Sequence, residues 1–500
     1  MKKTLMLVFC VAFLVLSACS GGKSNSNVSG SGGANSDAED TPKGPVELSF
    51  FIAGSGGNPP QEEDPILRKL NEDLNMKMDF NIVTMEYDQS LTARIAGGTP
   101  PDVFSVNNKS LKKFVDQNLV LELGAYLDQM PNIQQAYTDT DLSKGMYKGK
   151  LYGLSKRTDV QMYTYWVRKD WLDNLQLAMP RTLDEFRALL VSFTEDDPDG
   201  NGQDDTYGLT GTGFSAFTGI FTAHGVADPG NWMIKDNQVV YSTTDPAMKE
   251  ALAYINELIE AEVVDPEIIT NQNARDKAFK GQAGVIYINW PSMATDPVKA
   301  MYKEINANAE WVQMETFEGP GGSYQGIWDV GRNPAMIALS RSLEKEPEKL
   351  NKVLEFLNYI TDPGEGQITV NYGIEGIHYE IVGGEISMLP AISETAYAWQ
   401  MQLTGRSEME YLMTKFPGQK AEIEFAMNQP NIEVYTGFVP EPENVVIDHR
   451  YEEEELIKFM YGQRPLSEFD AFVETINNQY YLPERLAEAE RVLRELGHVE

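Results

Sequence analysis

The chain has 500 residues, a formal net charge of −34 at pH 7, and 42% hydrophobic and 10% aromatic residues. This composition fits ordinary globular packing, and the length exceeds what one hydrophobic core usually serves, so we expect two lobes. Such an acidic surface repels nucleic acid and anionic lipid headgroups, which excludes nucleic acid as a partner and argues weakly against a polyanionic ligand.

Residues 1–18 have the pattern of a cleavable signal peptide. Two lysines precede an apolar run, residues 5–16, that is too short to span a bilayer comfortably and ends in small residues. The sequence Leu-Ser-Ala-Cys19 resembles the bacterial lipobox, which implies cleavage before Cys19 and a diacylglycerol on its thiol. A lone cysteine in an ordinary secretion signal is the alternative. Because Cys10 leaves with the signal, a lipidated Cys19 leaves no thiol for a disulfide, a metal or a nucleophile.

Residues 19–45 are predicted to be a lipidated flexible tether. Residues 20–44 are mostly Gly, Ser and Asn and cannot bury enough apolar surface to fold. A random coil of this length spans roughly 25 to 30 Å. No later apolar segment is long enough to cross a bilayer, so we expect the lipid to be the only membrane attachment, on the extracellular face of the membrane.

The folded body begins with alternating strands and helices, which predicts an α/β fold with a parallel sheet. Ligands of such sheets bind beyond the carboxyl ends of the strands, which points to the loop 54–58 and to Asn107 and Asn108. The predicted elements are a strand at 46–52, a helix capped by Asp64-Pro65, a strand at 76–83, a helix at 90–96 and a strand at 103–104.

Five motifs in this order resemble the family 1 extracellular solute-binding proteins, and more narrowly the large lipoproteins that serve carbohydrate importers in Gram-positive bacteria. The resemblance runs from about Val46 through Tyr379. The motifs are AGGTPPDVF at 96–104, KGKLYGL at 148–154, YWVRKDWL at 165–172, TLDEF at 182–186 and KGQAG at 280–284.

The resemblance implies a two-lobed, periplasmic-binding-protein-like fold with a hinge and a cleft between the lobes. It also implies that a monomer binds a saccharide and delivers it to the permease subunits of an ABC importer. No catalytic residue is expected. We predict lobe 1 to comprise 46–160 plus 325–360, and lobe 2 to comprise 161–324 plus 361–500.

The segment from Asp197 to Asp205 has the spacing of a calcium-binding loop. Oxygen side chains at positions one, three, five and nine surround a bend at glycine six, and position seven supplies a backbone carbonyl, as in an EF-hand. Position twelve is Gly208 rather than glutamate, so we expect a weak, structural calcium site; a polar turn is the alternative. Alginate-binding members of the family carry a comparable loop. The predicted ligands are Asp197, Asp199, Asn201, Gln203 and Asp205.

Thr182 and Glu185 are predicted to form a capping box for a helix running to about residue 194. Further on we expect a strand at 238–241, a helix after Asp245-Pro246 and a strand ending at Trp290. The segment 325–339 and a helix at 347–360 should return to lobe 1. Helices capped by Ser467 and spanning 484–496 should pack onto lobe 2.

Sugar rings have apolar faces and hydroxyl rims, so the cleft should combine aromatic and polar side chains. For Trp290, core packing is the alternative. A surface-anchored sensor or adhesin, or a glycoside hydrolase, are the other function classes; the four histidines form no catalytic motif, but a pair of hydrolytic carboxylates is not excluded by the sequence. The substrate-binding candidates are Asn107, Asn108, Arg157, Asp159, Gln161, Trp232, Trp290, Trp328, Tyr372, Glu375, His378 and Tyr379.

Overall fold

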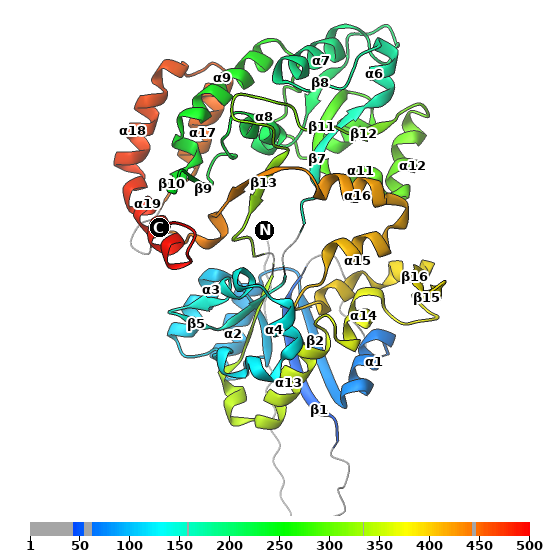
Figure 1. Cartoon of the computed structure of the whole chain (residues 1–500), viewed down its shortest axis with the longest axis vertical. Helices are drawn as coiled ribbons and strands as arrows, with labels where there is room; N and C mark the ends of the chain where they lie inside the picture. The colour runs from blue at the N-terminus through cyan, green and yellow to red at the C-terminus, as the bar shows by residue number, and fades with distance from the viewer. Residues whose placement is uncertain (1–43, 55–62, 158–159, 334, 443–446) are drawn as a thin grey trace, which may run out of the picture. The chain divides into compact units, whose positions relative to one another are not determined.

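Two β-sheets, one of five strands and one of four, organise the folded part of the chain (Figure 1). The computed structural model describes residues 44–54, 63–157, 160–333, 335–442 and 447–500. The predicted signal peptide, Cys19, nearly all of the tether, most of the loop 54–58 and Asp159 lie outside the described residues. Residues 45–500 form one compact unit.

The five-stranded sheet confirms the predicted parallel arrangement. β1 pairs in parallel with β2 and with β3, whereas β14 pairs antiparallel with β3 and with β6. The carboxyl ends of β1, β2, β3 and β6 therefore lie at one edge of the sheet. The strand order is β2 (Met76–Val83), β1 (Val46–Ala53), β3 (Val103–Val106), β14 (Met336–Leu339) and β6 (Gly153–Ser155).

Helices cover this sheet because their apolar residues recur on one face. In α1 (Pro65–Leu74), Asp64 caps the first turn by accepting the backbone N–H groups of Ile66 and Leu67 at 3.0 and 2.9 Å, as predicted. Phe356 of α13 packs edge-on against Phe50 of β1, with 5.2 Å between ring centroids. The other helices are α2 (Tyr87–Ala96), which begins earlier than predicted, α3 (Asn108–Asp116) and α13 (Pro347–Tyr359).

The four-stranded sheet has a mixed arrangement in which β11 pairs in parallel with β8 and antiparallel with β7. Phe186 from α7 stacks on Phe317, at 4.7 Å, in the core beneath it. The order is β12 (Trp311–Gln313), β7 (Tyr163–Arg168), β11 (Ala283–Asn289) and β8 (Tyr207–Thr210), with α7 (Leu183–Glu195), α8 (Thr218–Ala223) and α9 (Pro246–Glu260) around it.

The predicted capping box of α7 is only half formed. Thr182 Oγ1 accepts the backbone N–H of Glu185 at 3.2 Å, but the Glu185 carboxylate accepts the N–H of Arg181 rather than that of Thr182. In the bridge between Thr182 and Glu318, the Arg181 carbonyl and the Leu183 N–H bond the backbone of Glu318, and the Glu185 carboxylate binds the N–H one residue before Thr182.

The C-terminal helices pack onto the core of the four-stranded sheet, as predicted. Arg485 and Glu452 form a buried ion pair at 2.7 Å, and the Tyr241 hydroxyl donates to the same carboxylate at 2.5 Å. Ser467 is not a helix cap, because it lies within the short turn η8 and the next helix begins at Phe469. The elements are β9 (Trp232–Lys235), β10 (Gln238–Tyr241), α17 (Arg450–Met460), η8 (Leu466–Glu468), α18 (Phe469–Gln479) and α19 (Leu482–Glu495).

The core under the five-stranded sheet continues beyond residue 360, where we expected lobe 1 to end. Val370, Met401 and Leu403 pack into it, so much of 361–403 belongs with this sheet. β13 (Gly326–Asp329) does not join the sheet either; it pairs in parallel with β17 (Asn431–Val434). β13 and residues 156–157 and 160–162 lie in connections between the two sheets, whereas β17 runs between α16 (Lys420–Met427) and α17, which both pack on the side of the four-stranded sheet.

The remaining elements are short. They are η1 (Gly124–Gln129), α4 (Pro131–Ala136), α5 (Asp139–Ser143), β4 (Met146–Tyr147), β5 (Lys150–Leu151), α6 (Lys169–Leu175), η2 (Gly213–Phe217), η3 (Ser242–Thr244), α10 (Ala274–Phe279), α11 (Pro291–Ala294), α12 (Asp296–Ile305), η4 (Arg341–Lys345), α14 (Glu365–Tyr372), β15 (Tyr379–Val382), β16 (Glu385–Met388), η5 (Pro390–Met401), α15 (Glu408–Lys415), η6 (Pro417–Gln419), α16 (Lys420–Met427) and η7 (Thr436–Phe438).

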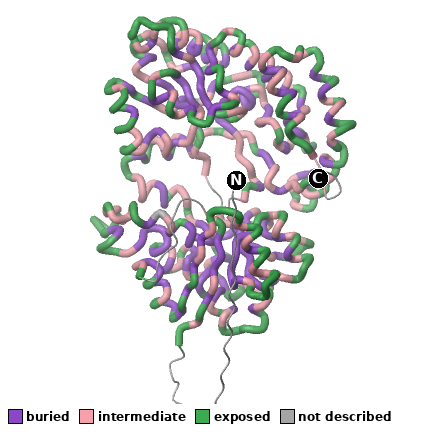
Figure 2. Tube along the Cα trace, turned by 180° about the vertical axis from the view of Figure 1, so that it is seen from behind, coloured by how far each residue is buried: buried purple, intermediate pink, exposed green. Residues whose placement is uncertain are grey.

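Buried residues follow the strands of both sheets, and exposed residues lie on the outer helices and turns (Figure 2). Among the described residues, no helix combines the length and the apolar character that a membrane span requires.

Candidate functional site

A cavity of about 500 Å³ lies at the carboxyl edge of the five-stranded sheet, where the fold predicts a ligand. Ala53 and Ser105, from the ends of β1 and β3, hold this edge together through a 3.0 Å hydrogen bond from the Ala53 N–H to Ser105 Oγ. The lining includes Ala53, Tyr87, Ser105, Asn107, Asn333 and Met336. One of the predicted residues, Asn107, is therefore in this cavity.

Asn107 and Asn108 have different roles in the structure. Asn107 caps α3: its Oδ1 accepts the N–H of Ser110 at 2.8 Å, while the amide remains exposed at the cavity. Asn108 Nδ2 donates to the Gly437 carbonyl at 2.8 Å and so ties α3 to the turn that follows β17. Asn107 is free to contact a ligand, whereas Asn108 is used in a contact between distant segments.

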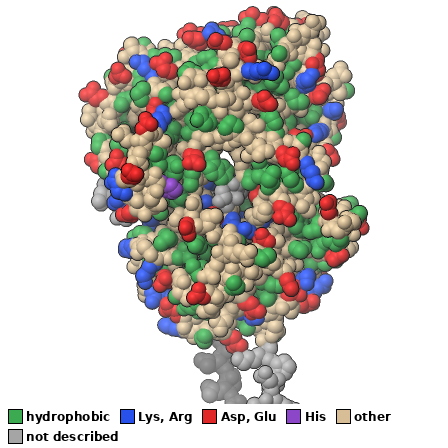
Figure 3. All heavy atoms as spheres, in the orientation of Figure 1, with side chains coloured by type: hydrophobic (Ala, Val, Ile, Leu, Met, Phe, Trp, Pro, Cys, Tyr) green, Lys and Arg blue, Asp and Glu red, His purple; other side chains and the backbone are tan. Residues whose placement is uncertain are grey.

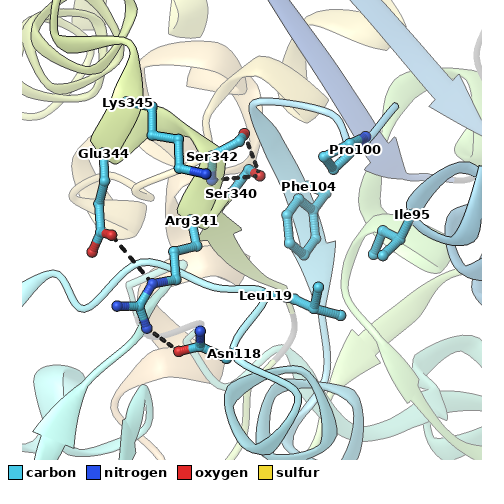
Figure 4. Close-up of a pocket in the computed structure, with 10 residues that line it drawn as sticks. All are labelled: Ile95, Pro100, Phe104, Asn118, Leu119, Ser340, Arg341, Ser342, Glu344 and Lys345. Carbon is cyan, nitrogen blue, oxygen red and sulfur yellow. Dashed lines mark hydrogen bonds and ion pairs between the residues drawn. The ribbon is translucent and has the colours of Figure 1, made fainter. Parts of the chain in front are cut away.

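A second cavity, of about 350 Å³, lies at the opposite edge of the same sheet (Figure 4). Pro100 precedes β3, and Ser340 follows the antiparallel β14, so both mark the amino ends of the parallel strands. Arg341 is held there by Glu344 at 3.2 Å and by Asn118 (Figure 4). Its position at the amino edge excludes it from the carboxyl-edge site.

Arg157 and Gln161 lie in the connection between β6 and β7. The backbone N–H and Nε of Arg157 both approach the Thr404 carbonyl at 3.4 Å, and Nη2 is buried without an acceptor among the described residues. Gln161 Nε2 donates to Asn431 Oδ1 at 2.9 Å. Gln161 thus bonds β17, while Arg157 Nη2 is a donor without an acceptor among the described residues.

Trp328 is half-buried on β13, where its side chain alternates with that of Ile327. Ile327 packs against the core of the four-stranded sheet, so Trp328 points to the other side of the strand. This position keeps Trp328 among the residues that could stack against a ligand.

Two predicted tryptophans lie in the core instead. Trp290 is 0% exposed and packs edge-on against Phe416 at 5.3 Å; Trp232 is 5% exposed and lies against Tyr241 at 4.8 Å. The chain turns into α11 directly at Trp290, and a segment more than one hundred residues later covers the indole. The prediction that these two residues line the cleft is therefore wrong for this structure.

The loop that follows α14 is fastened inward rather than open to a ligand. Tyr372 stacks on Tyr411 at 5.7 Å, and Tyr379 joins the same apolar cluster. His378 is buried, its Nδ1 accepts the Ile374 N–H at 2.9 Å, and burial lowers its pKa. The predicted substrate-binding role of these three residues is corrected to a packing role: apolar partners distant in sequence cover Tyr372 and Tyr379, and the Ile374 N–H and the Gly373 backbone hold His378 inward. Glu375 is exposed on this loop.

Exposed aromatic residues that the sequence interpretation missed lie near the connections. Tyr163, 43% exposed, begins β7 and lies 5.9 Å from Tyr287 on β11. Trp399 is 40% exposed, and with the Gln400 amide in its flipped orientation the indole N–H donates to the amide oxygen while the amide nitrogen donates to the Ala53 carbonyl at the carboxyl edge. The polar–aromatic alternation at 163–165 was the available signal for Tyr163, whereas no local pattern marks Trp399.

Asp228, which follows α8, is a buried carboxyl group with an incomplete set of hydrogen bonds among the described residues. Its Oδ2 accepts the Thr218 hydroxyl at 2.8 Å, whereas the buried Oδ1 has no partner among the described residues. Burial raises the pKa of Asp228 to about 7. This carboxyl can therefore change protonation near neutral pH.

The segment 197–205 forms a tight loop of polar contacts, an arrangement that fits both a calcium-binding loop and the alternative of a polar turn. Asp197 accepts the N–H groups of Asn201 and Gly202 at 3.0 and 2.9 Å, and the Asn201 amide lies 3.0 Å from Asp199 and 3.2 Å from Asp205. Partial burial and the neighbouring carboxylates raise the pKa of Asp199. No group of three His, Cys, Asp or Glu side chains in the described chain has the geometry of a metal site.

The structure also explains why position twelve of the loop is glycine. A Cβ atom at Gly208 would lie 2.6 Å from the Cα of Leu190 in α7, so a glutamate has no room there. Thr206, at position ten, is buried and donates to the Phe193 carbonyl at 2.7 Å. The donors that remain are the side chains of Asp197, Asp199, Asn201 and Asp205 and the carbonyl of Gln203, which suit a hard cation.

The comparisons with known proteins agree with this fold. The model of the bacterial extracellular solute-binding protein family matches residues 79–367. Lipoprotein LipO of Bacillus subtilis (strain 168) is 28% identical over 66% of this chain and 67% of its own. The polygalacturonan/rhamnogalacturonan-binding protein YtcQ of the same organism is 26% identical over 68% of each chain.

Among solved structures, an EF-hand mutant of the ABC-transporter substrate-binding protein FusA of S. pneumoniae, in complex with fructo-nystose, has a TM-score of 0.66. It is 17% identical and covers 90% of this chain and 99% of its own, a likeness that establishes the fold. Because the family model covers more than half of the sequence, and because the two-sheet architecture agrees with it, the chain belongs to the bacterial extracellular solute-binding protein family.

Proposed function

We propose that the protein binds an oligosaccharide at the carboxyl edge of the five-stranded sheet and delivers it to an ABC importer. The observation that carries this proposal is a set of aromatic side chains, the exposed Trp399 and Tyr163 and the half-buried Trp328, found on or beside the connections between the sheets. Flat aromatic rings stack on the apolar faces of sugars, and amides such as that of Asn107 bind hydroxyl groups. YtcQ is named for binding polygalacturonan and rhamnogalacturonan, and the FusA structure contains fructo-nystose, so both relatives support a saccharide as the ligand.

Binding is expected to draw the two sheets and their helices together around the ligand, since chain connections between the sheets, such as the one that contains β13, can serve as hinges. The closed form is then the one that the importer's permease subunits recognise. The saccharide leaves chemically unchanged, because the site is proposed to bind and not to cleave.

Thermal denaturation with a panel of oligosaccharides tests this proposal. A ligand that binds only the native state at a concentration of 100 Kd stabilises it by about 2.7 kcal/mol. Trp399→Ala should lose binding measured by calorimetry but fold normally, while Arg341→Gln, at the amino-edge cavity, should bind as the parent does. The absence of any stabilising saccharide would overturn the proposal. Chromatography of the bound sugar should recover it intact.

We also propose that the loop 197–205 binds calcium as a structural ion. After a rotation of the Asn201 amide that presents its oxygen, the three aspartates, Asn201 Oδ1 and the Gln203 carbonyl supply five oxygen ligands. Because the site has no bidentate ligand at position twelve, we expect a weak affinity that suits the millimolar calcium found outside cells. The ion would neutralise the mutual repulsion of the aspartates.

The family places the protein outside the cytoplasm. We propose that a lipid on Cys19 holds it to the outer face of the membrane and that residues 19–45 act as the tether. The Leu-Ser-Ala-Cys19 sequence supports this proposal. Labelling cells with a radioactive fatty acid tests it.

A further inference from the structure

Four basic side chains gather where the end of β6 meets the segment 399–415. The Gly405 backbone packs directly on Arg157, because a Cβ atom at Gly405 would lie 2.4 Å from the Arg157 nitrogen. Lys156 donates to the Trp399 carbonyl at 3.0 Å and lies 4.5 Å from the centre of its ring. Arg406 lies 3.5 Å above the Tyr411 ring, and Lys415 donates to the Tyr411 hydroxyl at 2.6 Å.

The two arginines are incompletely paired. Glu408 accepts one N–H of Arg406 at 2.7 Å, but Nε and Nη1 of Arg406 are buried without acceptors among the described residues. Among the described residues, Arg157 Nε contacts only the Thr404 carbonyl, and the buried Nη2 of Arg157 has no acceptor. A guanidinium carries five N–H donors and does not lose its proton, so each unsatisfied donor costs free energy.

This cluster contrasts with the rest of the surface. Acidic side chains are scattered over the face seen in Figure 3, in keeping with the net charge of −34. Charges farther away than about 8 Å are largely screened at physiological salt, so the local field depends on the groups nearby, which are these four cations and Glu408, the partner of Arg406. The argument from net charge against an anionic ligand therefore does not apply at this end of the sheet.

The cluster also lies beside an aromatic surface at the carboxyl edge. β6 is parallel to β3, so Lys156 and Arg157, which follow it, lie at the same edge as the cavity. Trp399, 40% exposed, is next to Gln400, whose side chain lies against Gly54 at the end of β1 and, in its flipped orientation, bonds the Ala53 carbonyl. A ring face and a neighbouring guanidinium are together suited to a sugar that carries a carboxylate.

We propose that the ligand is an acidic oligosaccharide and that Arg157, with Arg406 beside it, binds the carboxylate of a uronic acid unit. This inference rests on the proposed saccharide-binding function. A carboxylate satisfies guanidinium donors with two charge-assisted hydrogen bonds, which a neutral hydroxyl cannot match. Lys156 and Lys415 contribute positive charge around it.

Calorimetry on the full-length chain, with a defined oligogalacturonide and its carboxyl-reduced neutral form, separates the possibilities. The acidic form should bind at least tenfold more tightly, and its Kd should rise between 50 and 500 mM NaCl while that of a neutral sugar does not. Arg157→Gln should abolish the preference, and Arg341→Gln should leave it intact. The salt series on the parent protein decides the matter even if Arg157→Gln folds poorly.

Equal or tighter binding of the reduced form would overturn the carboxylate subsite while leaving saccharide binding in place. A neutral oligosaccharide that binds when the acidic ones do not would have the same consequence. Equal affinity for a sulfated oligosaccharide that contains no uronic acid would overturn the assignment to a carboxylate, because the site would then accept any anion. Failure of every saccharide, acidic or neutral, would refute the proposed function itself.

Discussion

Replacing Trp290 by alanine should destabilise the protein without changing ligand affinity. The side chain is 0% exposed and lies against Phe416. A tryptophan buries about 150 to 250 Å², which at about 25 cal/mol per Å² corresponds to about 4 to 6 kcal/mol. The indole N–H has no acceptor among the described residues, so the loss is one of packing alone. Measured truncations of this kind cost about 3 to 5 kcal/mol, and we expect that range.

The half-buried Trp328 is the matched comparison, since it lies on a connecting strand. For a unit of 150 to 250 residues, 1 kcal/mol shifts the melting temperature by about 2 to 4 °C, and the shift is smaller in the larger unit 45–500, so Trp290→Ala should melt lower by at most about 6 to 20 °C. Trp328→Ala should melt within a few degrees of the parent and lose saccharide affinity. Scanning calorimetry measures stability, and titration calorimetry below the transition measures binding. If Trp290→Ala melts normally but binds poorly, the core assignment is refuted.

Three further predictions follow from the loop, the buried acid and the signal sequence. Chelation of calcium should lower the melting temperature of the parent protein and leave that of an Asp197→Ala, Asp199→Ala double variant unchanged. An equal melting temperature of the parent with and without chelator would refute the calcium site. The raised pKa of Asp228 means that the native state binds an extra proton between pH 4 and 7, so its contribution to stability falls as pH rises through this range. Asp228→Asn should remove that decline in urea denaturation and raise stability at pH 8, and an unchanged pH profile would contradict the assignment. Cys19→Ala should abolish fatty-acid labelling and release or misprocess the protein; labelling equal to that of the parent would refute lipidation.

The sequence alone determined the elements of the first sheet and their order. The strand at 76–83 and the Asp64 cap depend on side-chain alternation and on a local hydrogen bond, and the structure has both as predicted. The spacing from Asp197 to Asp205 likewise determines the curl of its loop, because each contact joins residues at most five positions apart. Such features are set by neighbours in the chain.

Only the tertiary structure decided which aromatic residues are buried. Trp290 and Trp399 each stand near the end of a regular element, but a distant segment covers the first and leaves the second 40% exposed. The unpaired donors of Arg157 likewise depend on the return of Thr404 and Gly405, about 250 residues later in the chain. Burial and hydrogen-bond satisfaction depend on contacts between segments far apart in sequence, and a local pattern of residue types contains no information about those contacts.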